Sequence, residues 1–382
     1  MQTGKNMLFD DVIGQGEVKQ LLRRMLQEGR VPHALLFAGP PGSGKLAMAL
    51  ALAKSLLCRH PLADGSPCGQ CAGCKMTASL AHPDLHFVFP VFKPSGQSTP
   101  AVSDNFLPQW RQQLAETAYF TGQAWLRRIG VENQQALINV AEANGILTKL
   151  STVSSQGGYR VIVMWQADKL NDEAANKLLK ILEEPPARTV FLLTTDVPEK
   201  ILPTVLSRTQ RVEFRPLAEG DIAVALQTTA GLQPQDARKV AHAAGGSFTK
   251  ALEQVTADAD AAQFFDLFVL LMRLCYMRKV KDLQEWAVQV AQWGREKQKA
   301  FLAYAMRMVR ENFIHNFGLP QLNYMNDEET AFSAKFARFI NERNVIPISE
   351  ELERAQRDIE QNVNARMVFF DLALKLIVLL IQ

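Results

Sequence analysis

The sequence predicts an α/β domain built on a parallel sheet, followed by helical regions that fill the rest of the chain. Two observations predict the sheet: short apolar runs stand between polar residues, as in buried parallel strands, and a glycine-rich loop joins one such run to a helix. A third predicts the helical regions, because beyond residue 216 the apolar residues recur at helical spacing. With 382 residues, the chain is long enough for two to three domains.

The composition is that of an ordinary globular protein. Hydrophobic residues make up 47% and charged residues 21%, and the formal net charge of +3 is nearly balanced. A nucleic-acid role would therefore depend on a local basic patch and not on bulk charge. Residues 1–6 are polar and do not resemble a signal peptide, and the apolar segment 367–381 is broken by Asp371 and Lys375. We expect a cytoplasmic protein without a membrane contact.

The first predicted strand, 34–38, leads into a candidate phosphate-binding loop, and an Ala- and Leu-rich helix follows to Leu57. In such a loop, backbone N–H groups surround phosphate oxygens, and the helix N-terminus and the lysine add positive charge. The candidate nucleotide-binding residues are Gly39, Pro40, Pro41, Gly42, Ser43, Gly44 and Lys45. One position departs from the motif, because Leu46 stands where a Ser or Thr hydroxyl would bind Mg²⁺.

Four of the five cysteines lie within 17 residues: Cys58, Cys68, Cys71 and Cys74. Without an export signal, we expect reduced thiols or metal ligands and not disulfides. Four thiolates complete the tetrahedral shell of a structural zinc. The segment around them is too rich in turn formers to build a core, and a bound zinc would contribute on the order of 10 kcal/mol to its folding free energy. The alternative is a set of free thiols, and His60, His82 and His86 are each able to replace one thiolate. Cys275 is expected in the core of a helix.

Residues 93–130 are expected to form an insertion in the α/β domain. Its first part, 93–105, is rich in Pro, Ser, Gln and Thr and predicts a flexible loop. Its second part, 110–128, predicts a short helical segment with four aromatic residues. Aromatic side chains beside arginines are able to stack on nucleic acid, but packing against the domain is the more common role and is the one we expect.

The apolar run 161–164 predicts a buried strand, and a helix follows it. Asn171 or Asp172 is the expected N-cap, and Pro185 ends the helix. A buried strand that ends in acidic or amide residues before a helix is where proteins with a phosphate loop place their second nucleotide motif.

Further strands are expected within 82–90, at 189–195 and at 212–214. Ligands of open α/β sheets bind beyond the carboxyl ends of the strands, so we expect Thr194 or Thr195 near the position of a γ-phosphate. Arg208 follows, and a guanidinium is able to clamp phosphate oxygens. On composition alone, however, a single arginine is more often a surface charge.

These segments predict three parts. An α/β domain fills residues 1–215 and contains the cysteine module at 58–74. A small helical lid fills 216–257, and an all-helical region fills 258–382. The dense apolar stripe at 264–274 serves either as a core or as a subunit interface.

The order of these parts resembles the AAA+ clamp-loader proteins of DNA replication, most closely those of the delta-prime type in bacterial DNA polymerase III. The resemblance covers the chain apart from 93–130. Its most specific part is the run 175–186, Ala-Asn-Lys-Leu-Leu-Lys-Ile-Leu-Glu-Glu-Pro-Pro. The other matching stretches are Phe9-Asp-Asp-Val-Ile-Gly-Gln15, His33-Ala-Leu-Leu-Phe37, the phosphate loop, the four cysteines, His82-Pro-Asp84, Leu202–Arg208 and Asn362–Arg366.

The resemblance implies a P-loop AAA+ domain, a helical lid and a collar that joins other clamp-loader subunits. Through that complex the chain would act on a sliding clamp and on primer-template DNA, as part of a DNA polymerase III holoenzyme. It also implies that Arg208 reaches the ATP site of a neighbouring subunit as a finger that stabilises charge on the transferring phosphoryl group. Thr209 stands where the family's motif usually has Cys.

The departures from the family imply that this chain does not hydrolyse ATP. Active motors carry Asp-Glu-Ala-Asp after the second-motif strand, and here Trp165 and Gln166 replace the Mg²⁺-binding Asp and the water-activating Glu. Leu46 removes a further Mg²⁺ ligand, and Thr249 stands where the lid arginine is expected. Losing one catalytic group commonly costs about 10²-fold in rate. We expect the phosphate loop to hold ATP weakly or not at all.

Two rival functions come from other classes. The first is an active AAA+ ATPase motor of the clamp loader, which Leu46, Trp165 and Gln166 disfavour. The second is a zinc-dependent DNA-binding protein with a vestigial AAA+ part, which the balanced charge disfavours.

Overall fold

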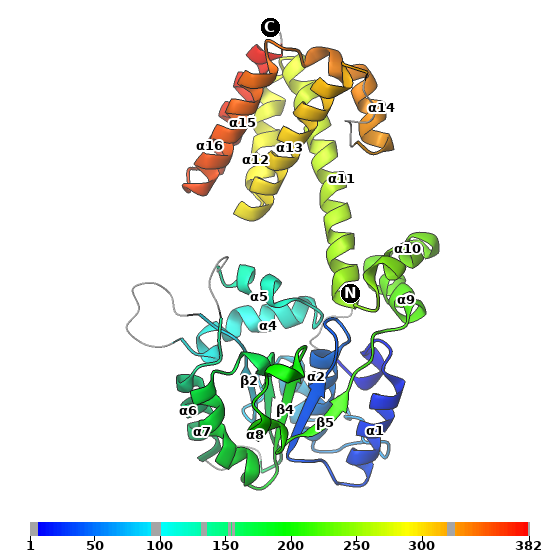
Figure 1. Ribbon diagram of the computed structural model, residues 1–382, viewed down its shortest axis with the longest axis vertical. Helices are drawn as coiled ribbons and strands as arrows, with labels where there is room; N and C mark the ends of the chain where they lie inside the picture. Colours follow the sequence, from blue (N-terminus) through cyan, green and yellow to red (C-terminus); the bar gives the residue numbers. More distant parts are fainter. Residues whose placement is uncertain are drawn as a thin grey trace. The chain divides into compact units, whose positions relative to one another are not determined.

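The computed structural model describes residues 7–92, 101–130, 136–151, 154, 157–318 and 325–380 (Figure 1). The chain divides into two compact units, Met1–Val255 and Thr256–Gln382. The long helix α11, Phe248–Tyr276, contributes residues to both units. The predicted boundary between lid and collar at residue 257 therefore falls inside a helix and not in a linker.

In the described part of the first unit, five parallel strands form one sheet in the order β2-β3-β4-β1-β5. The strands are β1 Ala34–Ala38, β2 Leu85–Val88, β3 Arg160–Met164, β4 Thr189–Thr195 and β5 Gln210–Glu213. The predicted parallel sheet is confirmed, although β5 begins two residues before the expected strand at 212–214. Ala38 pairs with Thr195 and Met164 with Leu193, so the carboxyl ends of the three central strands meet at one edge.

Helices cover both faces of this sheet because side chains alternate along each strand. Leu35 and Phe37 belong to a core that includes α2, whereas Ala34 and Leu36 belong to a core that includes α6 and α7. Every residue of α2 is buried, which explains its uniform Ala and Leu content. The helices of this unit before α11 are α1 Gly16–Gln27, α2 Lys45–Leu56, α3 Ala72–Ala78, α4 Leu107–Glu116, α5 Gly122–Arg128, α6 Val140–Ser151, α7 Asp172–Glu183, α8 Pro203–Leu206, α9 Glu219–Ala230 and α10 Pro234–Ala244.

The insertion packs against the sheet domain through its aromatic residues, as predicted. Trp110 on α4 and Trp125 on α5 are fully buried against Phe89, with ring centroids 4.2 and 4.9 Å from it. The indole N–H of Trp125 donates to the backbone oxygen of Pro90 at 3.0 Å. The loop expected at 93–105 is only partly described: residues 93–100 lie outside the described residues, and a 3₁₀ helix at Ser103–Phe106 corrects the expectation for its end.

The second unit is helical throughout its described residues, as predicted. After α11 come α12 Val280–Ala291, α13 Arg295–His315, α14 Asp327–Phe336, α15 Val345–Glu360 and α16 Ala365–Leu379. The apolar stripe at 264–274 contributes to the core of this unit, where Phe268, Phe301 and Phe369 are fully buried. Among the described helices, none has both the length and the apolar character needed to cross a membrane.

The structure resolves the N-cap of α7, which the sequence left open between two residues. The side-chain oxygen of Asn171 accepts a hydrogen bond from the Ala174 N–H at 2.8 Å, and Asp172 is the first helical residue. The helix ends at Glu183, before Pro185. This cap fixes the start of the helix that follows the second nucleotide motif.

We expect Asn171→Ala to lower the free energy of unfolding of the first unit by about 1 kcal/mol, because one N-terminal N–H of α7 loses its acceptor. Asn171→Ser keeps an acceptor and is the matched control. Urea unfolding followed by tryptophan fluorescence measures the difference. An unchanged midpoint for the alanine variant would contradict the capping role.

Candidate functional site

The phosphate loop joins the end of β1 to the start of α2, as the sequence predicts. Gly42 and Gly44 adopt φ angles of 77° and 91°, a region that favours glycine. Both glycines also meet close neighbours: Gly42 lies against Ser247, and a Cβ on Gly44 would lie 3.1 Å from the hydroxyl oxygen of Tyr119. The loop is therefore in contact with other segments of the chain on the side where a ligand would approach.

The hydrogen-bond donors of Lys45 are engaged by the protein itself. Its Nζ donates to the backbone oxygens of Gly39 and Pro40 at 2.8 and 2.6 Å. It also forms an ion pair with Asp196 at 2.8 Å. Burial lowers the pKa of Lys45, while the carboxylate of Asp196 opposes that shift. The charge that would face a phosphate is therefore matched by a carboxylate at the end of β4.

The second motif begins directly after β3 and contributes packing where a motor has carboxylates. Trp165 is buried, with its ring 5.4 Å from Trp110 and 4.8 Å from Phe120. The N–H of Gln166 donates to the hydroxyl of Thr194 at 3.3 Å. Leu46 is also buried. These side chains offer no carboxylate or hydroxyl to a metal at the positions where the motif calls for one.

The cavity beside the phosphate loop is small, at about 90 Å³. Pockets that bury a small-molecule ligand usually have about 300–1,000 Å³. Part of its lining comes from predicted site residues: Pro41, Gly42, Gly44, Lys45 and Thr194. Much of the rest comes from the insertion, at residues 118–122. In this conformation the cavity has no room for a nucleoside triphosphate.

The four clustered cysteines converge at the end of α2 and the start of α3. Their Sγ atoms all lie within 4.8 Å of one another, and Cys58 and Cys68 are 3.6 Å apart. A tetrahedral zinc with thiolate ligands requires sulfur atoms about 3.8 Å apart, so the cluster fits a metal ion. Burial raises the pKa of the Cys58 and Cys74 thiols. At Cys71, burial also raises the pKa, but N–H donors and neighbouring thiols outweigh it and lower the pKa to about 6. His82, a possible replacement ligand, instead accepts the Asp84 N–H at 3.1 Å.

Arg208 follows α8 and contacts α7. Its Nε and Nη2 donate to one carboxylate oxygen of Glu183 at 3.1 and 2.9 Å, and its Nη1 donates to the backbone oxygen of Thr204 at 3.0 Å. The side chain is 29% exposed and does not line the cavity beside the phosphate loop. The structure therefore does not bring Arg208 together with the candidate nucleotide-binding residues of this chain.

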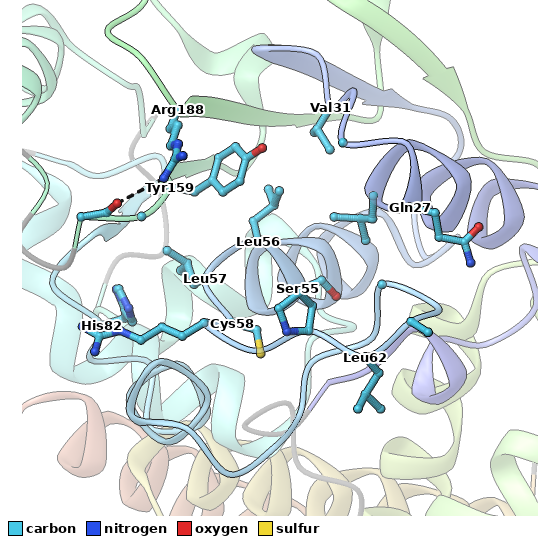
Figure 2. A pocket seen from close by; sticks show the side chains of 18 residues that line it. Gln27, Val31, Ser55, Leu56, Leu57, Cys58, Leu62, His82, Tyr159 and Arg188 are labelled. Carbon is cyan, nitrogen blue, oxygen red and sulfur yellow. Dashed lines mark hydrogen bonds between the residues drawn. The ribbon is translucent and has the colours of Figure 1, made fainter.

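A second cavity, of about 810 Å³, lies at the opposite edge of the sheet, where β3 and β4 begin (Figure 2). Tyr159, Arg188, Leu57, Cys58 and His82 are among its lining residues, and Arg188 donates to the backbone oxygen of Gly157 at 3.3 Å. The walls of this cavity come from several separate segments, and two of them, at Cys58 and His82, belong to stretches that the sequence analysis singled out.

Sequence reasoning missed two residues at the phosphate loop. The role of Asp196 was predictable from the sequence, because a carboxylate directly after Thr195 stands at the carboxyl end of a central strand, where ligands bind. Tyr119 had none, because it is one aromatic residue in an irregular insertion.

Comparison with known proteins identifies the family. The family model for the DNA polymerase III delta subunit matches residues 14–218, more than half of the chain. The chain is 32% identical over 203 residues to the DNA polymerase III subunit delta' of Bacillus subtilis, which covers 53% of this chain and 48% of that protein. It is 35% identical over 182 residues to the Escherichia coli subunit delta', which covers 48% of this chain and 42% of that protein. The chain thus spans about half the length of these curated relatives.

Solved structures show weaker likeness. A RuvB variant from Thermotoga maritima aligns with a TM-score of 0.40 and 16% identity, covering 67% of this chain and 65% of that one. A DNA polymerase III gamma subunit-related protein from the same organism aligns with a TM-score of 0.35 and 13% identity, covering 94% and 97%. Because both scores are below 0.5, the family assignment depends on the sequence comparisons: the chain belongs to the DNA polymerase III delta subunit family.

Proposed function

We propose that this chain is a clamp-loader subunit that does not hydrolyse ATP and that supplies Arg208 to the ATP site of a neighbouring subunit. Hydrolysis at that neighbour would accompany the loading of a sliding clamp onto primed DNA. Membership of the family supports the subunit role. The observation that carries the non-hydrolysing role is the second motif, where Trp165 and Gln166 occupy the positions of the Mg²⁺ ligand and the water-activating base.

The chemistry of phosphoryl transfer supports this reading. The reaction needs a metal ion across the phosphates and a group that orients or deprotonates the attacking water. An amide such as Gln166 neither binds a proton at neutral pH nor holds a cation by charge. Lys45 is already paired with Asp196, and Leu46 has no oxygen for a metal. Each of these features removes a part of the catalytic machinery.

The position of Arg208 is compatible with a role in trans. Its guanidinium lies outside the lining of the chain's own phosphate-loop cavity and is partly exposed. A planar guanidinium with several N–H donors is well suited to phosphate oxygens. The finger role comes from the resemblance of the run Leu202–Arg208 to the family's motif, and the exposure leaves the side chain accessible to a partner.

The remaining parts have supporting roles in this proposal. The helical residues 258–382 form the collar that joins the other subunits of the hetero-oligomer, and the clamp and primer-template DNA are reached through that complex. The cysteine cluster holds a structural zinc, since its four thiols and near-tetrahedral spacing leave no position for a substrate. The metal therefore stabilises the short loops of 58–74 and takes no part in catalysis.

We expect no ATP turnover by the isolated chain above that of Lys45→Ala, with Mg²⁺ and primed DNA present, because the metal ligand and the base are both missing. Release of inorganic phosphate measures the rate. Turnover that disappears in the Lys45→Ala variant would overturn the proposal and establish the rival function, an active motor.

We expect Arg208→Ala to reduce ATP hydrolysis at the adjoining site of the assembled clamp loader by about 10²-fold or more, because a charged donor to the transferring phosphoryl group is lost. Arg211→Ala is the matched control, since Arg211 is a nearby surface arginine paired with Glu213. DNA-stimulated ATPase and analytical gel filtration are measured together. Normal turnover in an intact Arg208→Ala complex would remove the finger assignment.

We expect about one zinc per chain in protein purified without chelators. Cys74→Ala should lose that zinc, because three thiolates leave the shell incomplete. Cys275→Ala should retain it, because Cys275 lies in the helical core of the second unit. Mass spectrometry of the metal content gives the ratio. A metal-free wild-type chain would reject the site.

A further inference from the structure

We infer that residues 118–122, here called the plug segment, occupy the phosphate-loop site as a built-in substitute for a nucleotide and fasten the helical lid to the sheet domain. Neither the family nor the proposed function assigns a role to this part of the insertion. The inference concerns the isolated chain and does not depend on the role of Arg208.

Tyr119 is the centre of the plug segment. Its buried hydroxyl accepts the N–H of Ile13 at 3.1 Å. The same hydroxyl lies against Gly44 of the phosphate loop, where a Cβ would be 3.1 Å away. Its ring meets Phe248, the first residue of α11, edge to face with centroids 5.0 Å apart. One aromatic side chain thus contacts the N-terminal segment, the phosphate loop and the lid.

These are contacts of the type that a nucleobase makes with a protein. A flat ring fills an apolar gap, and one polar atom accepts a backbone N–H that would otherwise be buried without a partner. The hydroxyl of Tyr119 supplies that acceptor to Ile13. Burial raises the pKa of Tyr119, so the ring remains neutral throughout the physiological range.

The residues after Tyr119 extend the plug across the second motif. Phe120 packs on Trp165 with centroids 4.8 Å apart, and Trp165 in turn contacts the fully buried Trp110. A Cβ on Gly122 would lie 3.0 Å from the side-chain nitrogen of Gln166. Aromatic pairs of this kind stabilise a structure beyond the burial of their surface alone. The segment is therefore anchored on both motifs.

The plug also reaches the lid through hydrogen bonds. The hydroxyl of Thr121 donates to the carboxylate of Glu253 on α11 at 3.1 Å. Beside it, the N–H of Phe248 donates to the backbone oxygen of Gly42 at 3.2 Å. The lid is thus joined to the phosphate loop both directly and through the plug. In a nucleotide-binding subunit, the nucleotide would have to provide such a bridge.

The positive charge of Lys45 is also paired within this site. Lys45 is neutralised by Asp196 and donates to Gly39 and Pro40, so no phosphate is needed to satisfy it. With a cavity of about 90 Å³, a nucleotide would have to displace Tyr119 and break the ion pair together. In this conformation the plug segment and Asp196 thus stand around Lys45 where the phosphates of a nucleotide would lie.

Hydrogen exchange on the full-length chain tests the bridge. In Tyr119→Ala, we expect amides 248–255 to exchange at least about 5-fold faster, because opening of the lid no longer breaks the Tyr119 contacts. Tyr119→Phe keeps the ring, so only the amide of Ile13 should accelerate. Tyr276→Ala, at an exposed tyrosine of the second unit, should leave these amides unchanged. If Tyr119→Ala does not fold, the Tyr119→Phe variant is the test. An unchanged exchange rate of the Ile13 amide in that variant would overturn the inference.

Titration of wild type with a fluorescent ATP analogue and Mg²⁺ tests the occupancy of the site. We expect no saturable binding up to millimolar concentration, and no protection of amides 248–255. One-to-one binding that Lys45→Ala abolishes would overturn the plug, as would unchanged exchange at 248–255 in a folded Tyr119→Ala variant. Binding of the analogue without turnover would overturn the plug inference but not the proposed non-hydrolysing function. The two proposals therefore fail on different results.

Discussion

The ion pair between the buried Lys45 and the partly exposed Asp196 is the interaction on which the conformation of the phosphate loop depends. An ammonium group in an apolar surrounding needs partners of opposite charge or good acceptors, since an unpaired buried charge costs several kcal/mol. Here a carboxylate and two loop carbonyls supply them. The loop thereby has a stable conformation of its own, and the segments around it are able to close over it without a ligand.

The second motif shows how catalytic positions have become packing positions. Trp165 stands where a motor has a metal ligand, and its ring connects Trp110 to Phe120. Tryptophan buries a large apolar surface, which a carboxylate at the same place would not do. At this position, one residue therefore both leaves out the carboxylate and completes an aromatic cluster. Leu46, buried in place of a hydroxyl residue, follows the same principle.

The sequence predicts those parts of the fold that local patterns encode. Apolar runs identified the strands, the glycine-rich loop identified its helix, and the spacing of Cys58 to Cys74 identified a cluster that the structure brings within 4.8 Å. The bridge from Tyr119 to Ile13 joins residues 106 positions apart, and no local pattern records such a pairing. The pairing of Lys45 with Asp196 is equally long-range. The pairing of Lys45 with Asp196 depends on the parallel sheet, which brings the carboxyl ends of β1 and β4 to one edge.

Under the proposed function, the pairing of Arg208 with Glu183 would keep a finger in trans ready. Glu183 occupies the Nε and Nη2 edge of the guanidinium, and Thr204 accepts from Nη1, so the free chain orients the side chain while little of its donor capacity faces outward. Because both partners are partly exposed, at 29% and 59%, the ion pair contributes less than about 1 kcal/mol and is readily exchanged. The γ-phosphate of a neighbour carries more negative charge than one carboxylate and would therefore compete for the same donors. If the proposed function holds, a weak pairing within the chain would orient Arg208 before assembly and still allow its transfer to a stronger anion.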